Sequence, residues 1–527
     1  MAGESRVPPG RAALAVAVLL ATAPDPASAD SPISAIDWLS RELAAPITGA
    51  PPRVDGPAAG PVSDGVVDPP VTVRTLDAPG DLGAGLFPAA RVGLPADFWG
   101  ATGAGELAVR LRGVRGDGLP AAQRALQHIL LAEFDPPVAT DSASAEALML
   151  ARIDKLIAFG TLDQAKALVT SGARITPAVW QRWFDLSLLL GEEDRACARL
   201  REDGGFLAPL PARAFCLARG GDWAAAMLSV QTAQTLDAID PVDAALLLRF
   251  LDAEDAEAEE PPGPPPASMT PLRWRLLEAV GDPVSTGALP LAYAHADLRG
   301  TAGWRAQIEA AERLTRSGAL EPNRLLGRYT DARAAASGGV WDRVRASPAL
   351  EAALARDDPQ AVGAALQQLW PLLRDAALEV PFARLIAERL DGVALSGTAR
   401  DLGFEVALLG GNAPLAEALK PDTARARFLL ALATGAPLPT PPSDADGRAE
   451  AIAGGLADDA TPPPLIAQRL ADGHGGDSAL VALDRLADAK RGDLRALSEA
   501  LPVLRAVGME PVARRAALEL MLLGWAH

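Results

Sequence analysis

One pattern of apolar and polar positions occurs three times between Leu156 and Val230. In each copy an aliphatic run ends at a glycine, a short and mostly polar stretch follows, and an alanine stands five positions after the glycine. The copies begin at Gly160, Gly191 and Gly221 and end at Ala165, Ala196 and Ala226, with spacings of 31 and 30 residues. A period of about 20 to 50 residues is typical of stacked helical hairpins, because one hairpin cannot bury its apolar stripe alone. The pattern predicts an all-α chain arranged as an α-solenoid.

The third copy, Gly221–Ala226, resembles the turn between the two helices of a tetratricopeptide repeat (TPR). In that turn the glycine permits a tight reversal and the alanine lets the two helices approach closely. The resemblance covers roughly 146–251 and implies TPR-like helical hairpins. The same spacing returns twice later, at Gly411 with Ala416 and at Gly508 with Ala513. We therefore expect the hairpins to continue to the C-terminal end.

The region before these hairpins has a different pattern. Ser34–Leu43 carries apolar residues at helical spacing beside Trp38, and the chain from Pro46 to about Gly105 is rich in Pro and Gly, which interrupts helices. A short strand is expected at Val71–Thr75. Phe98 and Trp99 lie near the end of this extended segment. Trp38, Phe98 and Trp99 have two interpretations, as anchors that clip the segment onto its own solenoid or as a partner-binding site.

Pro-rich stretches and an acidic run divide the helical part into blocks. The predicted organisation is a signal peptide (1–29), a short helix with an extended Pro/Gly-rich segment (30–105), a TPR-like α-solenoid (106–251), an acidic and Pro-rich linker (252–267), a second helical block (268–435), a Pro-rich linker (436–464) and C-terminal helices (465–527).

The first residues are typical of a secretory signal. Arg6 and Arg11 precede the apolar stretch Ala12–Ala23, and Ala27-Ser28-Ala29 fits the small-residue rule for cleavage before Asp30. The apolar stretch is too short for a bilayer span, and no later stretch approaches one. We therefore expect export to the periplasm, with no membrane insertion after the signal is cleaved.

Charge and cysteine content narrow the possibilities further. The formal net charge of −18 repels nucleic acid and anionic lipid surfaces, so neither is an expected partner. Cys197 and Cys216 are the two cysteines of the chain and lie 19 residues apart, on neighbouring predicted helices. In an oxidising compartment such a pair favours a disulfide. The alternatives are two buried thiols or a metal site, although a metal site would need His or acidic ligands nearby in the sequence in a recognisable spacing and none are found.

Several strings in the chain resemble a family of uncharacterised exported proteins of alpha-proteobacteria, some of which carry the label "antifreeze glycopeptide". The strings are Val71–Val73, Gly93–Pro95, Ala310–Leu314, Gly318–Leu320, Arg328–Tyr329 and Ala334–Arg343. The resemblance spans most of the mature chain and implies export but no activity. The chain has no Ala-Ala-Thr repeat that would present sugars to ice.

No constellation of catalytic, cofactor-binding or metal-ligating residues is apparent in the sequence, so none is predicted. Ser337, in Ser337-Gly338-Gly339, is the best candidate for a reactive residue, but a serine nucleophile needs an oriented base. His295 and His474 stand in no motif. We expect a non-catalytic scaffold or adaptor that binds an envelope protein or peptide, for example of the flagellar motor or a wall-synthesis complex. The alternative is a cell-wall hydrolase with a helical body and a site around Ser337 and His295.

Overall fold

A computed structural model of the chain describes residues 84–138, 141–171, 175–202, 208–252, 266, 268–443 and 446–523. All of them belong to the second of the two units into which the chain divides, Arg74–His527. The expected signal peptide, Trp38, and the short helix and strand predicted before residue 84 lie outside the described residues. Nearly all of the acidic linker predicted at 252–267 lies outside them as well.

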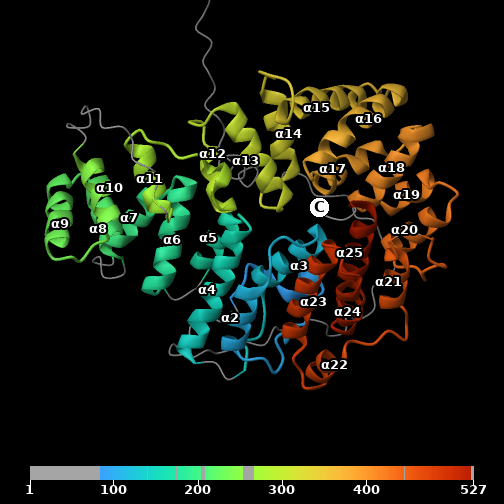
Figure 1. The fold of residues 1–527 in the computed structure, drawn as a ribbon, viewed down its shortest axis with the longest axis horizontal. Coiled ribbons are helices and arrows are strands. Elements are labelled where there is room, and N and C mark those ends of the chain that lie inside the picture. Colours follow the sequence, from blue (N-terminus) through green and yellow to red (C-terminus); the bar gives the residue numbers. More distant parts are fainter. Residues whose placement is uncertain are drawn as a thin grey trace, which may run out of the picture. The chain divides into compact units, whose positions relative to one another are not determined.

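The described residues contain 24 α-helices and two strands of two residues each, which confirms the all-α class (Figure 1). The first helices are α2 (Ala104–Gly113), α3 (Pro120–Leu131), α4 (Ser142–Ala158), α5 (Leu162–Thr170), α6 (Pro177–Leu190), α7 (Glu193–Glu202), α8 (Leu210–Arg219), α9 (Trp223–Thr235) and α10 (Pro241–Leu251). The next are α11 (Pro271–Ala279), α12 (Ala294–Asp297), α13 (Trp304–Arg316), α14 (Pro322–Asp331), α15 (Val340–Ala355), α16 (Pro359–Asp375), α17 (Glu379–Ile386), α18 (Gly397–Gly410), α19 (Ala413–Leu419) and α20 (Ala424–Thr434). The last are α21 (Arg448–Gly455), α22 (Pro464–Ala471), α23 (Gly475–Lys490), α24 (Leu494–Ala506) and α25 (Glu510–Leu523).

The glycine–alanine spacing marks the turns between consecutive helices, as the sequence predicts. Gly160, Gly191, Gly221, Gly411 and Gly508 all have φ between 73° and 88°, and each separates two helices. After each glycine the next amide donates back to a carbonyl five positions earlier, as in Asp222 N to Leu217 O at 3.0 Å. This hydrogen bond is typical of a helix that ends at a left-handed glycine. The alanines five positions after the glycines are all fully buried, so each turn brings two helices into close contact.

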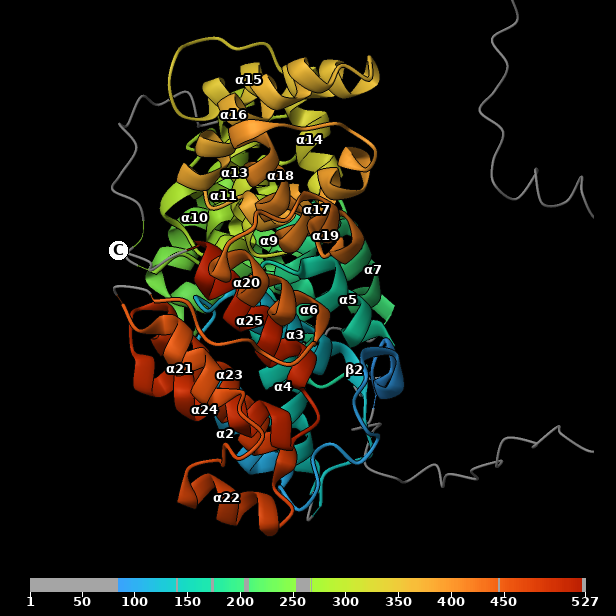
Figure 2. The ribbon, with the colours of Figure 1, turned by 90° about the vertical axis from the view of Figure 1, so that its right-hand side faces the viewer.

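Helices far apart in the sequence also pack together. α3 contacts both α23 and α25, α2 contacts α23, and α20 contacts α25 (Figure 2). Most buried apolar side chains accordingly belong to one hydrophobic cluster, whose first residue in the sequence is Ala84 and whose last is Met521. In a regular solenoid each hairpin contacts only its neighbours. The contacts between the first and last described helices go beyond that arrangement.

A second, smaller hydrophobic cluster belongs to the part of the chain with the three repeated turns. It is built mainly from α6 to α11. One face of α6 supplies it with Trp180, Phe184 and Leu188, at helical spacing, and the rings of Trp180 and Phe184 stack at 5.1 Å. The other face of α6 adds Val179 and Leu189 to the large cluster. α6 is therefore the helix that joins the two clusters.

Two ranges predicted without helices have more structure than the Pro and Gly content indicates. α21 lies inside the linker predicted at 436–464, because Ala449 and Ile452 are fully buried and give this short stretch a face to pack. The range 84–105 contains the strand β1 (Phe87–Pro88), which pairs in parallel with β2 (Ala132–Glu133). The buried Arg152 fixes this region by donating hydrogen bonds to the carbonyl groups of Ala84 and Leu130 at 2.8 and 2.9 Å.

Asp185 on α6 makes the stability of the fold dependent on pH. Burial raises the pKa of its carboxyl to about 7, although the Gln181 amide donates to Oδ1 at 2.9 Å. A raised folded-state pKa means that this site favours the fold fully below about pH 4 and loses that contribution as the pH rises towards 7. In wild type, this site should change the free energy of unfolding by up to about 4 kcal/mol between about pH 4 and pH 7. We expect Asp185→Asn to lack this change, as measured by urea unfolding at several pH values in that range. The exposed Asp331→Asn variant should keep the wild-type profile, and an unchanged profile in Asp185→Asn would contradict the prediction.

Candidate binding surface

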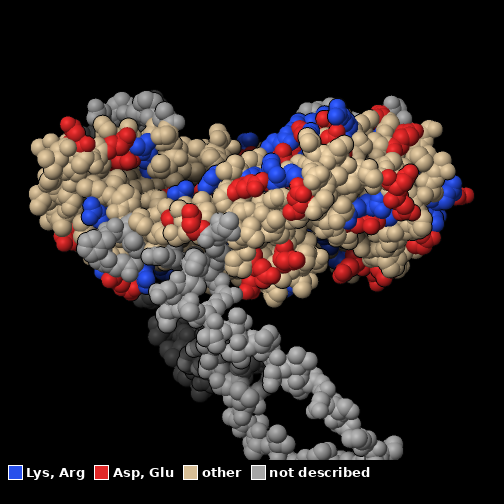
Figure 3. Space-filling model, turned by 90° about the horizontal axis from the view of Figure 1, so that it is seen from below, with Lys and Arg blue, Asp and Glu red and all other residues tan. Residues whose placement is uncertain are grey.

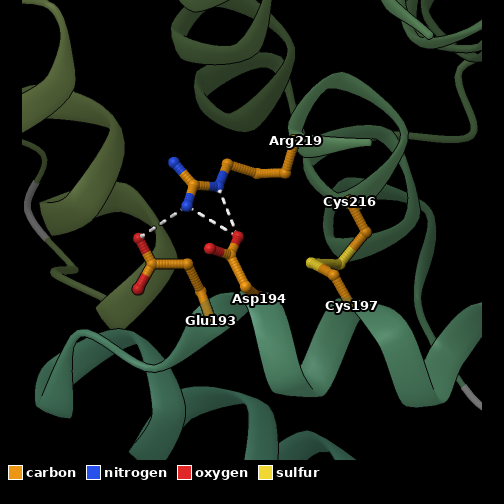
Figure 4. Close-up of a disulfide and its surroundings, with 5 residues drawn as sticks. All are labelled: Glu193, Asp194, Cys197, Cys216 and Arg219. Atoms are coloured by element: carbon orange, nitrogen blue, oxygen red, sulfur yellow. Dashed lines mark hydrogen bonds and ion pairs between the residues drawn. A yellow bond between two sulfur atoms is a disulfide. The ribbon is translucent and has the colours of Figure 1, made fainter. Parts of the chain in front are cut away.

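The predicted disulfide between Cys197 and Cys216 is present and joins α7 to α8 (Figure 4). Cys197 is 1% exposed and Cys216 is 3% exposed, and both belong to the smaller hydrophobic cluster. The bond therefore crosslinks consecutive helices on either side of residues 203–207. It confirms that interpretation of the cysteine pair over the alternative of two buried thiols.

A cluster of charges joins the same two helices beside the disulfide. Arg219, in the last turn of α8, donates Nε and Nη2 to Asp194 Oδ1 at 3.0 and 2.6 Å, and Glu193 Oε1 lies 3.9 Å from Nη2 (Figure 4). Glu193 also accepts from Arg275 of α11 at 2.9 Å. The acids occupy the first turn of α7 and Arg219 the last turn of α8, the ends where the helix dipoles favour these charges. The disulfide and the charges together fix the orientation of α8.

Phe98 and Trp99 are packed inside the protein. They are 5% and 4% exposed, and both rings lie about 5 Å from the ring of Phe134. A Cβ at Gly476 would come within 2.8 Å of the Trp99 ring, so the start of α23 also presses against it. The structure thus supports the interpretation in which these rings clip the extended segment onto the helical body. They do not present an exposed surface to a partner.

Exposed apolar side chains share one depression on α8 and α9, whereas others, such as Val109 and Leu465, lie on other helices. The α8–α9 groove, a depression of about 460 Å³, is lined by leucines from both helices and the adjoining turns: Leu210, Leu217, Leu228 and Leu236. Leu228 is 66% exposed and Leu236 is 71% exposed, which is unusual for large apolar side chains in one groove. The repeat pattern marks α9 only by the turn that precedes it, because the apolar residues of this helix occur on all its sides.

The groove is also nearly free of charge. No charged residue occurs from Trp223 to Leu236, and Arg213 is the one charged residue among those described that line the groove. On the face that Figure 3 shows, charged side chains are sparser towards the end that carries α8 and α9 than towards the opposite end, where acidic and basic groups lie close together. In a chain with a net charge of −18, the uncharged stretch from Trp223 to Leu236 is the feature of the sequence that could have indicated the α8–α9 groove.

The candidate catalytic residues do not come together through hydrogen bonds. Ser337 is exposed, and within the described part of the chain it bonds to no histidine. His295 Nε2 lies 2.5 Å from the carbonyl oxygen of Gly160, and burial lowers the pKa of its imidazole. His474 Nδ1 lies 3.0 Å from the hydroxyl of Thr102. Among the described residues, no group of three or more His, Cys, Asp and Glu side chains is arranged to hold a metal ion.

No family model, curated protein or solved structure matches the chain. Within the residues that the structure describes, no helix combines the length and the hydrophobicity needed to cross a bilayer.

Proposed function

We propose that this chain is an exported, non-catalytic adaptor that binds a protein or peptide of the cell envelope through the α8–α9 groove. The observation that carries the proposal is the exposure of Leu228 and Leu236 in a groove almost without charge. Large exposed apolar side chains that share one depression mark interaction sites more often than isolated ones do. The predicted signal peptide supplies the periplasmic address.

The chemistry of the groove defines the partner. Burying α9 requires no ionised side chain of that helix to lose its water, so the desolvation cost is small. Removing two leucines from water favours binding at about 25 cal/mol per Å². The partner should therefore offer a short apolar segment, such as one face of an amphipathic helix. A component of the flagellar motor or of a wall-synthesis complex fits this description.

The surrounding architecture supports a binding role. TPR-like hairpins of an α-solenoid commonly present curved surfaces to peptides, and the turn at Gly221 that precedes α9 resembles a TPR turn. The disulfide and the Arg219 cluster hold α8 in place before a partner arrives. A surface that is already ordered loses less conformational entropy on binding.

A photo-crosslinking residue at Leu236, introduced into the full chain in intact cells, tests the proposal. We expect it to capture one dominant envelope protein, and the same residue at the distant Arg356 to capture none of it. With that protein purified, Leu228→Glu should weaken binding at least about tenfold, because a carboxylate must then be buried against apolar groups. Gln231→Glu adds the same charge to the exposed part of α9, away from the groove, and should bind within about twofold of wild type. Equal losses in both variants, or capture of wall fragments alone, would contradict the adaptor function.

A further inference from the structure

A second cavity lies between helices that are distant in the sequence. It has a volume of about 430 Å³ and is lined by α3, by the end of α13 and the start of α14, and by α17, all labelled in Figure 1. The Gln127 side chain of α3 donates to Ser317 O at 2.9 Å, and Arg316 Nε donates to Ala376 O at 2.9 Å. The first bond joins two walls of the cavity, and the second fixes the end of α13 against the residue that follows α16. The helices that line this cavity contribute to the large hydrophobic cluster. The cavity shares no lining residue with the α8–α9 groove.

Three arginines line this cavity, and two of them lack partners. Arg124 and Arg384 are half-buried, yet neither makes a hydrogen bond or ion pair with any described residue. Other arginines of similar burial are paired, as Arg115 is with Asp484 and Asp488 at 2.9 and 2.7 Å. Withdrawing a guanidinium from water without a partner is unfavourable. Two such groups in one cavity are therefore unexplained by the fold alone.

The acidic residues nearby do not neutralise the arginines. Glu321 is the one carboxylate among the described lining residues, and it forms no ion pair with Arg124. Glu519 is fully buried beside α3, but its oxygens accept from Ala121 N at 2.7 Å and from Arg515 Nε at 3.1 Å. Burial lowers the pKa of Arg124, and the attraction to Glu519 and Glu321 only partly opposes this. The cavity keeps an excess of positive charge within an acidic chain.

Thr315 supplies an independent sign of a missing ligand. It lines the cavity and is 1% exposed, and its Oγ1 is buried without a hydrogen-bond partner among the described residues. A threonine in a helix normally bonds to a carbonyl of the preceding turn when no other acceptor is available. A buried hydroxyl left unsatisfied costs free energy that an acceptor in the cavity would recover. Thr315 thus places an unsatisfied donor among the residues that line the same cavity as the two guanidinium groups.

The direction of the helices adds to the positive potential. Pro120, Pro322 and Pro381, from the first turns of α3, α14 and α17, all line the cavity. The N-terminal end of a helix carries a partial positive charge, and it falls off within the first turn. The end of α3 already holds the Glu519 carboxylate through Ala121 N, so the ends of α14 and α17 are the ones that favour the same sign of ligand as the arginines do.

We propose that this cavity binds a small molecule through a doubly charged oxyanion, with Arg124 and Arg384 pairing to it and Thr315 donating a hydrogen bond. Guanidinium groups bind phosphate and carboxylate oxygens in a two-pronged geometry, and two unpaired groups match two negative charges. The ligand is either a phosphate or a dicarboxylate, since both offer this chemistry. The site is separate from the α8–α9 groove, so either proposal stands if the other fails.

Titration calorimetry of the full mature chain with inorganic phosphate, succinate and acetate tests the site. We expect saturable binding of phosphate, succinate or both, and acetate should bind at least about tenfold more weakly because it carries one charge. Phosphate alone would identify a phosphoryl ligand, and succinate a dicarboxylate. Arg124→Gln and Arg384→Gln should each weaken binding about ten- to a hundredfold. Arg333→Gln removes the same charge from an exposed position outside the cavity and should bind within about twofold of wild type.

Thr315→Val separates binding from folding. The substitution removes an unsatisfied buried hydroxyl and keeps the shape of the side chain, so the unliganded protein should melt at the same or a higher temperature. The same variant should bind the anion about tenfold more weakly. Wild-type affinity in Thr315→Val, no saturable binding of either dianion at millimolar concentration, or equal losses in Arg333→Gln and Arg124→Gln would each overturn the proposal.

Discussion

Arg343→Met is expected to lower the free energy of unfolding by about 3 to 5 kcal/mol, because it breaks a buried ion pair and leaves one charge behind. Arg343 donates Nε and Nη2 to the two carboxylate oxygens of Glu312, both at 2.7 Å, and the Tyr329 hydroxyl donates to Oε1 at 2.6 Å. Arg343 is 8% exposed, Glu312 4% and Tyr329 fully buried. The group ties α13, α14 and α15 together. Removing the arginine leaves a buried carboxylate with no positive partner.

Urea unfolding of three variants checks this prediction. Arg345→Met changes the neighbouring arginine of α15, whose partner Asp342 is at the surface, and should cost less than about 1 kcal/mol. Glu312→Gln with Arg343→Met removes both charges and keeps an acceptor for Tyr329, so it should recover most of the lost stability. If Arg343→Met unfolds at the same urea concentration as wild type, the buried Glu312 carboxylate does not need Arg343 for the stability of the fold, and the prediction is wrong.

The parts of the fold that were predicted correctly depend on residues close together in the chain. The spacing of Gly221 and Ala226 determines both the left-handed turn and the close helix contact, so a short string carries all the information. The disulfide was predictable for a related reason, since Cys197 and Cys216 lie on consecutive helices. Local pattern also explains the all-α class.

The features that were missed depend on distant residues. The cavity takes Arg124 from α3, Thr315 from α13 and Arg384 from α17, and nothing in any one of these helices indicates that the other two are near. Proline content was misleading at 436–464, because the burial of Ile452 against later helices outweighs the local preference for a linker. The burial of Phe98 and Trp99 likewise depends on α23, more than 370 residues later. Tertiary contacts decide such cases and leave little trace in a single sequence.

Cys197→Ala with Cys216→Ala is expected to cost about 3 kcal/mol, and the loss should be confined to the helices of the smaller hydrophobic cluster. In the chain-entropy model a crosslink over 19 residues restricts the unfolded chain by about this amount. The two cysteines pack with Phe184 and Phe215 in a cluster distinct from the one that holds α23 to α25. Local opening of α7 to α10 therefore need not disturb the rest.

Hydrogen exchange followed by mass spectrometry tests both the size and the place of the effect. In the double variant, amides of α7 to α10 should exchange roughly a hundredfold faster, as about 3 kcal/mol implies, while those of α24 keep wild-type protection. Reducing the wild type should reproduce this pattern, and a reductant should leave the double variant unchanged. The variant should also bind the envelope partner more weakly, because α8 and α9 then sample open states that lack the groove. Uniform acceleration across α24 as well would show that the two clusters unfold together and would contradict the prediction.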